Sequence, residues 1–133
     1  MQTFLPYDSL QLSVSCLDNR RLGKQRVEAY QILNTLKGKS KGWVNHPAVK
    51  MWKGYENALG VYMNLCIDEW VRRGFNNTME KEKETDLVLL PSWFGNKLFH
   101  ASHRSNLLRK DPTFYSQYGW KEQNNLPYVW PSK

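Results

Sequence analysis

The 133-residue sequence has very little cysteine and no long hydrophobic run. Its longest apolar stretches, such as residues 87–90, are four to five residues long, whereas a membrane-spanning helix needs about 20. No apolar segment follows a basic start, so we expect no secretory signal. Cys16 and Cys66, the only cysteines, cannot form a disulfide framework or a four-cysteine zinc site. These absences predict a reduced, cytoplasmic protein without a membrane anchor.

Several motifs of common enzyme classes are missing. Residues 38–40, Gly-Lys-Ser, resemble the end of a phosphate-binding loop, but the earlier glycine is absent and no strand pattern precedes them. There is no nucleophile elbow of a hydrolase. His100 and His103 share one helical face, but structural zinc needs four ligands and both cysteines are remote. We interpret the two histidines as surface residues and expect no metal site.

Acidic residues are scarce in one stretch of the chain. The whole sequence has a net charge of +7 and a pI near 9.5. Residues 19–53 contain nine Lys or Arg and a single acid, Glu28, and residues 97–121 contain five bases against Asp111. Such an excess favours nucleic acid, an anionic membrane or an acidic small molecule as partner. Separate solvated helix faces would also explain it, but we favour one cationic surface formed by both stretches.

No alternating strand pattern occurs, and the apolar spacing predicts an all-α fold. The first helix should run from a cap at Asp18 or Asn19 to Gly38. The second should begin at Pro47, capped by Asn45 or His46, bend near Gly54 and end at Gly74, with most of its aromatic residues in the core. The third should run from about residue 97 or 101 to residue 110. We expect one compact domain over residues 1–133, with about three main helices, long ordered loops, a solvated connector at residues 78–86 and an aromatic C-terminal tail.

The side of the first helix opposite its apolar residues contains the isolated acid. Arg21, Lys24, Gln25, Glu28 and Gln31 share this side. An ordinary ion pair between Glu28 and Lys24, four residues apart, would explain the carboxylate and contribute a few tenths of a kcal/mol. Alternatively, a single carboxylate within an anion-binding surface would stabilise a developing positive charge or act as an acid or base. The residues alone favour neither explanation.

Four segments in order along the chain resemble the pyrimidine-dimer DNA glycosylases, small all-helical repair enzymes. They are residues 17–28, residues 38–47 (Gly-Lys-Ser-Lys-Gly-Trp-Val-Asn-His-Pro), residues 73–76 (Arg-Gly-Phe-Asn) and residues 112–119 (Pro-Thr-Phe-Tyr-Ser-Gln-Tyr-Gly). The resemblance therefore covers nearly the whole chain. The family pattern has an arginine directly before its glutamate, where this chain has Val27, with Arg26 one position earlier.

The resemblance implies a chemistry that needs neither a metal nor an organic cofactor. In the family, the N-terminal α-amine attacks C1′ of a damaged nucleotide, a Schiff base forms, the base leaves and the strand is cut by β-elimination. The essential glutamate falls on Glu28. Because Gln2 is too large for the usual removal of the initiator methionine, the resemblance assigns the nucleophile to the amine of Met1. An unperturbed α-amine has a pKa of about 7.7–8.0, so part of it is neutral at cellular pH.

The resemblance and the charge distribution together predict the partner and the DNA-binding residues. We expect a monomer that binds double-stranded DNA containing a lesion. A glycosylase for another modified base, a non-catalytic nucleic-acid-binding module and a different enzyme with an anionic small substrate remain alternatives. The residues expected to contact DNA are Gln2, Arg20, Arg21, Lys24, Arg26, Lys39, Lys41, Asn45, His46, Tyr115, Tyr118 and Trp120.

Overall fold

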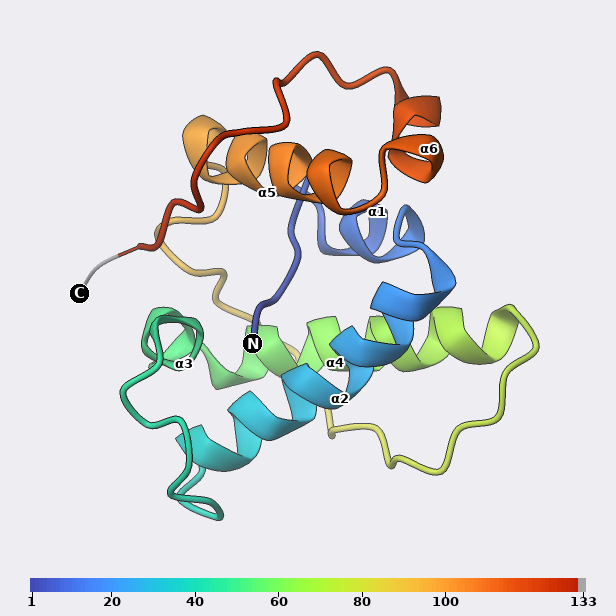
Figure 1. Ribbon diagram of the computed structural model, residues 1–133. Coiled ribbons are helices and arrows are strands. Elements are labelled where there is room, and N and C mark those ends of the chain that lie inside the picture. The colour runs from blue at the N-terminus through green and yellow to red at the C-terminus, as the bar shows by residue number, and fades with distance from the viewer. Residues whose placement is uncertain (132–133) are drawn as a thin grey trace.

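The computed structural model describes residues 1–131, and within them every regular element is a helix (Figure 1). This confirms the predicted all-α fold, with α2, α4 and α5 as its main helices. The elements are α1 (Leu10–Ser15), α2 (Asn19–Leu36), α3 (Pro47–Trp52), α4 (Glu56–Arg72), α5 (Lys97–Lys110), α6 (Pro112–Tyr115) and the short 3-10 helix η1 (Ser116–Tyr118).

Helix α2 begins and ends where its capping residues predict. The Asp18 side chain accepts a hydrogen bond from the Arg21 backbone N–H, which satisfies one of the free donors at the helix start. The Tyr115 hydroxyl also donates to this carboxylate. Burial opposes ionisation of Asp18, but the hydrogen bonds from Tyr115 and Arg21 outweigh it and lower its pKa. The helix ends at Leu36, and Gly38 then takes a left-handed conformation with φ of 78°.

The second predicted helix is two helices separated by a break at the expected glycine. Pro47 occupies the first turn of α3, and the His46 ring accepts a hydrogen bond from the Ala48 N–H at 3.0 Å. The chain turns at Gly54, whose φ is 89°, and continues as α4. Gly74, with φ of 94°, follows the end of α4.

Three short helices were not predicted. Helix α1 begins after Ser9, whose side chain accepts from the Leu12 N–H, and α6 begins after Asp111, which caps it in the same way. Helix η1 follows α6 directly. Each spans two turns or fewer, so none repeats an apolar position often enough to show a period.

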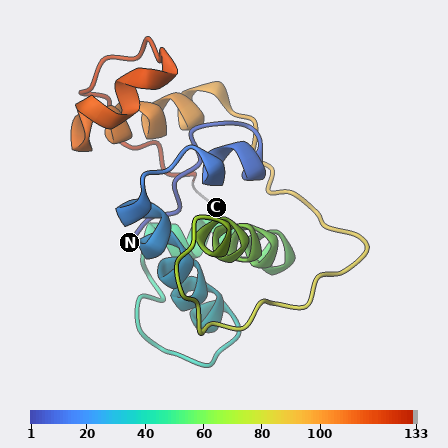
Figure 2. The ribbon, with the colours of Figure 1, turned by 90° about the vertical axis from the view of Figure 1, so that its right-hand side faces the viewer.

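The helices form two layers with the N-terminal segment between them. Helices α2 and α4 cross in one layer, and α5 and α6 form the other together with the C-terminal segment (Figures 1 and 2). At the α2–α4 crossing, Gly23 lies against the ring of Trp70, and a Cβ at this position would be only 2.9 Å from that ring. The extended residues 2–6 run between the layers from α5 toward α2 (Figure 1).

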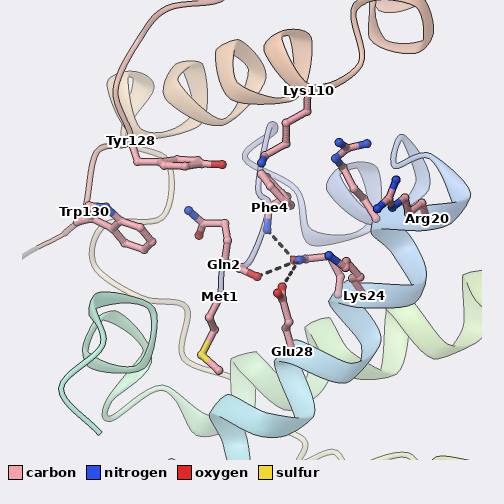
Figure 3. A pocket seen from close by; sticks show the side chains of 11 residues that line it. Met1, Gln2, Phe4, Arg20, Lys24, Glu28, Lys110, Tyr128 and Trp130 are labelled. Carbon is pink, nitrogen blue, oxygen red and sulfur yellow. Dashed lines mark hydrogen bonds between the residues drawn. The ribbon is translucent and has the colours of Figure 1, made fainter. Parts of the chain in front are cut away.

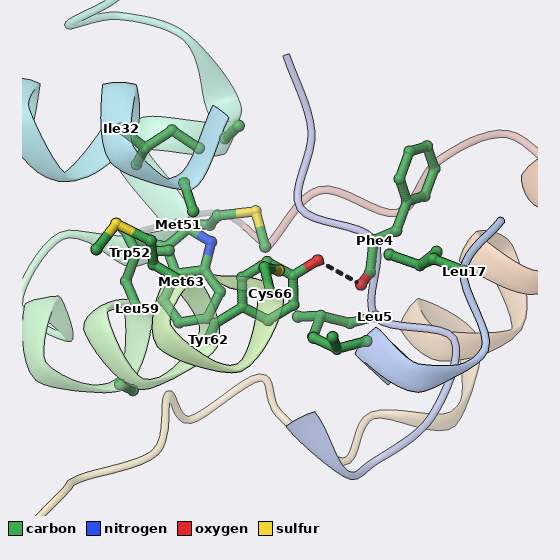
Figure 4. Packing of buried hydrophobic residues seen from close by; sticks show 14 of the residues in the cluster. Phe4, Leu5, Leu17, Ile32, Met51, Trp52, Leu59, Tyr62, Met63 and Cys66 are labelled. Carbon is green, nitrogen blue, oxygen red and sulfur yellow. Dashed lines mark hydrogen bonds between the residues drawn. The ribbon is translucent and has the colours of Figure 1, made fainter. Parts of the chain in front are cut away.

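The core lies between the layers and is rich in large side chains (Figure 4). Trp52 and Tyr62 are fully buried, which confirms that the aromatic residues of the second predicted helix mainly pack inside. Leu5 from the N-terminal segment and Leu17 from the α1–α2 junction are buried as well. Because residues 4 and 5 belong to this core, the start of the chain is fixed by the same packing that stabilises the helices.

Residues 78–86 form the solvated connector that their charges predict, with most of their side chains exposed. No helix within residues 1–131 is long and apolar enough to cross a membrane.

Candidate active site

The first residues of the chain are held by side chains from three helices. The Phe4 N–H donates to Gln25 Oε1 on α2 at 2.7 Å, and the Leu5 N–H donates to His103 Nδ1 on α5 at 2.8 Å. The Tyr62 hydroxyl on α4 lies 3.0 Å from the Phe4 carbonyl oxygen. The segment therefore lies in one defined position although it belongs to no helix or sheet.

His100 and His103 belong to this arrangement, and our interpretation of them as surface residues is wrong. Both are buried, because the shared face of α5 points at the N-terminal segment. The Gly95 N–H donates to His100 Nε2, so Nδ1 carries the proton and donates to the Leu5 carbonyl oxygen at 2.7 Å. Burial lowers the pKa of His103 to about 3, which keeps its Nδ1 free to accept from Leu5.

Gln25 joins the N-terminal segment to the candidate carboxylate. Its Nε2 donates to the Gln2 carbonyl oxygen at 2.8 Å and to Glu28 Oε2 at 2.9 Å (Figure 3). Its Oε1 accepts from the Phe4 N–H and from the Tyr62 hydroxyl. Both hydrogens of the amide and both lone pairs of its oxygen are thus used. One buried side chain on α2 fixes Glu28 relative to the start of the chain.

A pocket of about 460 Å³ lies over this network. Met1 and Glu28 lie together along its lower edge in Figure 3, and a cationic wall from α2 stands beside them. Phe4 and two aromatic residues of the C-terminal segment, Tyr128 and Trp130, line the other part. The lining consists of Met1, Gln2, Phe4, Arg20, Arg21, Lys24, Gln25, Glu28, Lys110, Tyr128 and Trp130.

Burial and the positive charges around the pocket lower the pKa of one of its lysines, Lys110. Lys110, at the end of α5, extends toward the pocket from the opposite layer (Figure 3). Burial, followed by the positive charges of Arg21, Arg109 and Lys24, lowers the pKa of Lys110, while Glu28 opposes the shift. Cations from α2 and α5 are therefore concentrated around a single carboxylate, as the charge distribution predicts. An anionic ligand would relieve this mutual repulsion.

His46 lies near the start of the chain, beside the pocket. Burial and the positive charge of the α-amine both lower its pKa, which places the imidazole close to the N-terminus. Its ring contacts Trp43 on one side and Trp130 on the other, with ring centroids 5.9 Å apart in both cases. Lys39, Lys41 and Asn45 are exposed on the preceding loop and do not line the pocket.

Arg26 does not line the pocket. It lines a neighbouring groove on α2, donates to Asn77 Oδ1 at 2.6 Å and lies 4.9 Å from the centre of the Trp70 ring. These contacts anchor the chain that follows α4. The side chain of Arg26 therefore has a structural role in this conformation. Val27, its neighbour, lies in the same groove and is exposed.

The aromatic residues predicted to contact DNA make hydrogen bonds within the protein, and Tyr118 and Trp120 are half-buried. Tyr115 is fully buried and donates to Asp18, so it has no surface with which to touch DNA. Tyr118 donates to the Cys16 carbonyl oxygen, and the Trp120 indole donates to the Tyr7 hydroxyl. The aromatic residues of the tail that reach the pocket are Tyr128 and Trp130. The C-terminal segment has no periodic pattern, so the sequence could not predict that these two aromatic residues reach the pocket.

Gln25 and Lys110 are further pocket residues that the sequence did not single out. Lys110 belongs to the second basic stretch, residues 97–121, and this was the sequence feature that could have identified it as a pocket residue. Within residues 1–131, no group of three or more His, Cys, Asp or Glu side chains is placed to hold a metal ion.

The family model of pyrimidine dimer DNA glycosylases matches residues 1–83. The chain belongs to this family. Membership implies a pyrimidine dimer DNA glycosylase function in DNA repair. No curated protein and no solved structure matches the chain significantly.

The matched range of the pyrimidine dimer DNA glycosylase family covers one part of the pocket. It contains Met1, Glu28 and the basic residues of α2, whereas Lys110, Tyr128 and Trp130 lie beyond it. The family match therefore bears on the edge formed by Met1 and Glu28 and on the basic residues of α2, whereas the residues of α5 and of the C-terminal segment that line the pocket lie outside it.

Proposed function

We propose that this chain excises cyclobutane pyrimidine dimers from double-stranded DNA and then cuts the strand, using the α-amine of Met1 as nucleophile. One observation carries the proposal. Met1 and Glu28 line the same cation-rich pocket, and Gln25 bonds to both the Gln2 backbone and Glu28. The family match supports the glycosylase activity, and the strand cleavage is our inference from the nucleophile.

The proposed reaction begins at C1′ of the damaged nucleotide. The neutral amine of Met1 forms a bond to C1′, and the bond from C1′ to the base nitrogen breaks, with its electron pair and a proton going to the departing base. The sugar ring then opens at the C1′–O4′ bond, O4′ takes a proton and a protonated imine remains. Loss of a C2′ proton drives β-elimination of the 3′ phosphate, and water hydrolyses the imine to release the enzyme.

Glu28 suits two parts of this sequence. Its carboxylate lines the same pocket as Met1, where a negative charge would stabilise the cationic sugar and imine. It also provides a base that removes the C2′ proton. This role explains why a negatively charged residue lies in a site that binds DNA. Gln25 holds one carboxylate oxygen at 2.9 Å, so the other oxygen remains for the substrate.

The cations have the simpler task of binding the DNA backbone. Arg20 and Lys24 are exposed at the rim of the pocket, and Lys110 faces them from α5. Phosphates bound there release counterions, so affinity should fall steeply with salt. In this proposal the exposed loop before α3 extends the DNA-binding surface beyond the pocket. Its residues Lys39, Lys41, Asn45 and His46 contact the DNA there.

Incision of defined duplexes tests the function. We expect untagged protein to cut a duplex with one cyclobutane dimer and a duplex with one abasic site, and to leave the undamaged duplex intact. Cleavage of the abasic duplex alone would refute the dimer as substrate. Tight binding without cleavage of either duplex would refute the enzyme and indicate a binding module.

A further inference from the structure

Trp43 has a backbone conformation that side chains of its size rarely adopt. Its φ is 67°, and within residues 1–131 it is the only residue other than glycine with a positive φ. In this left-handed region a Cβ crowds the neighbouring backbone, so a bulky residue costs free energy that glycine or asparagine largely avoids. A conformation of this kind is retained where the side chain has a use that offsets its cost.

The turn that contains Trp43 is held by hydrogen bonds on both sides. The Thr35 hydroxyl, near the end of α2, bonds to the Gly42 carbonyl oxygen at 3.0 Å, and the His46 N–H donates to the Trp43 carbonyl oxygen at 2.9 Å. The loop that joins α2 to α3, residues 37–46, is thereby fixed at the edge of the molecule (Figure 1). The indole stands in a defined position without any ligand.

Burial does not explain why a tryptophan occupies this position. The side chain of Trp43 is 60% exposed, the largest exposed fraction of any Phe, Trp or Tyr among the described residues. Its neighbour Val44 is exposed as well. Removal of apolar surface from water, which would offset the cost of the backbone conformation, is therefore largely absent at this turn.

The charges of the loop indicate the kind of partner that Trp43 meets. Lys39 and Lys41 are exposed on the same loop, and the sequence has no acid between Glu28 and Glu56. Lysines suit the phosphates of DNA, and an exposed indole between them suits the faces of the bases.

Two ring contacts connect Trp43 with the candidate active site. Its indole contacts the His46 ring edge-on, and that ring contacts Trp130 in the lining of the pocket, with centroids 5.9 Å apart in both cases. His46 is also near the α-amine of Met1, whose charge adds to burial in lowering the pKa of the imidazole. DNA bound over the pocket therefore passes close to Trp43.

We propose that Trp43 inserts into the duplex beside the lesion and stacks on the neighbouring base pair, as apolar wedges do in proteins that kink DNA. The two linked pyrimidines of a dimer stack poorly on their neighbours, so the helix opens there at lower cost than elsewhere. Trp43 is thereby a specificity-determining residue, because it binds only where the stack is open. The inference rests on the proposed function, since the open stack exposes the sugar that Met1 attacks.

Two substitutions of Trp43 separate the aromatic ring from the backbone conformation. Trp43→Asn removes the ring and suits the left-handed conformation, so the turn should persist. Trp43→Tyr keeps an aromatic ring at the same place. Leu87→Asn removes another exposed apolar side chain, which lies outside the pocket between α4 and α5, and is the matched control.

The readout compares cleavage of a dimer-containing duplex with binding of an undamaged duplex. At protein concentrations below half-saturation, we expect Trp43→Asn to cut the dimer duplex about 10-fold more slowly than wild type, and Trp43→Tyr and Leu87→Asn to stay within about threefold. The affinity of every variant for the undamaged duplex, measured by fluorescence anisotropy, should stay within about twofold of wild type, because the lysines that bind its phosphates remain. The thermal midpoint of Trp43→Asn should equal or exceed that of wild type, since asparagine relieves the backbone cost.

Dimer cleavage by Trp43→Asn at the wild-type rate would overturn the inference. Equal losses on the two duplexes would also overturn it, because they would indicate a general contact with the DNA backbone, and so would a lower thermal midpoint, which would assign the side chain to the fold. Unchanged cleavage with Trp43-dependent binding to phosphatidylglycerol vesicles would assign the loop to a lipid surface instead.

Failure of the proposed function gives a different pattern. In that case the wild-type protein itself leaves the dimer duplex uncut, whereas failure of the wedge alone leaves wild type and Trp43→Asn cutting it equally fast.

Discussion

At the scale of single residues, Gln25 organises the site. It is buried on α2 and uses its whole amide to join residues 2 and 4, Tyr62 and Glu28. The helical period correctly placed Gln25 on the same side of the helix as Glu28. Helical period does not reveal that another segment covers that side, so the burial of Gln25 could not be predicted.

The role of Glu28 can be tested by removing its charge alone. We expect Glu28→Gln to bind the dimer-containing duplex with unchanged affinity and to cut it at least about 100-fold more slowly, the usual size of an acid–base contribution. Single-turnover cleavage and fluorescence anisotropy measure the two effects.

Glu80→Gln is the control for Glu28→Gln, because Glu80 is exposed on the connector and lies outside the pocket. It should behave as wild type. A Glu28→Gln variant that cuts as fast as wild type would show that the carboxylate has no part in the reaction.

At the scale of elements, capping residues and glycines predicted the main helices well. Asp18, Pro47, Gly54 and Gly74 mark helix boundaries because their side chains or backbone angles favour those positions in any fold. The spacing of His100 and His103 places both on one face of α5, but spacing does not tell which face of a helix is buried. The partner of that face is the N-terminal segment, which has no pattern of its own.

The burial of His103 on α5 predicts a stability that depends on pH. Its folded pKa is about 3, well below the ordinary value of 6.5. Below pH 6.5 the unfolded chain therefore binds a proton that the folded protein does not. The stabilisation is complete above pH 6.5 and is lost as the pH falls toward 3, by about 1.4 kcal/mol per pH unit.

Urea unfolding of wild type and His103→Gln at pH 7 and pH 5 measures this loss. Glutamine offers an acceptor to the Leu5 N–H but does not titrate. We expect the free energy of unfolding of wild type to fall by about 2 kcal/mol more than that of the variant between these two pH values. An identical pH dependence of the two proteins would show that His103 is not held neutral.

At the scale of the whole molecule, the second basic stretch joins the first. Lys110 at the end of α5 and Lys24 on α2 are far apart in sequence and line one pocket. The charge distribution predicted such a joint surface. It could not predict that Tyr128 and Trp130, rather than Tyr118 and its neighbours, supply the aromatic wall, because that choice depends on the path of the C-terminal segment between α5 and α3.

The joint surface makes a quantitative prediction for DNA binding. We expect Arg20→Ala and Lys24→Ala each to reduce the slope of log Kd against log salt concentration by about one, since each cation replaces one counterion on the DNA. Fluorescence anisotropy over a range of salt concentrations gives the slope. Lys81→Ala, which removes a cation paired with Asp68, should leave it unchanged. Unchanged slopes in both pocket variants would place the DNA elsewhere.

Borohydride trapping identifies the atom of the protein that attacks the DNA. Untagged protein is incubated with abasic and dimer-containing duplexes in sodium borohydride, and the adduct is mapped by peptide mass spectrometry. We predict one covalent adduct per chain, on the α-amine of Met1, and none when that amine is acetylated. An adduct on Lys24 or Lys110, which line the same pocket, or no adduct from protein that cuts the DNA, would show that the α-amine of Met1 is not the nucleophile.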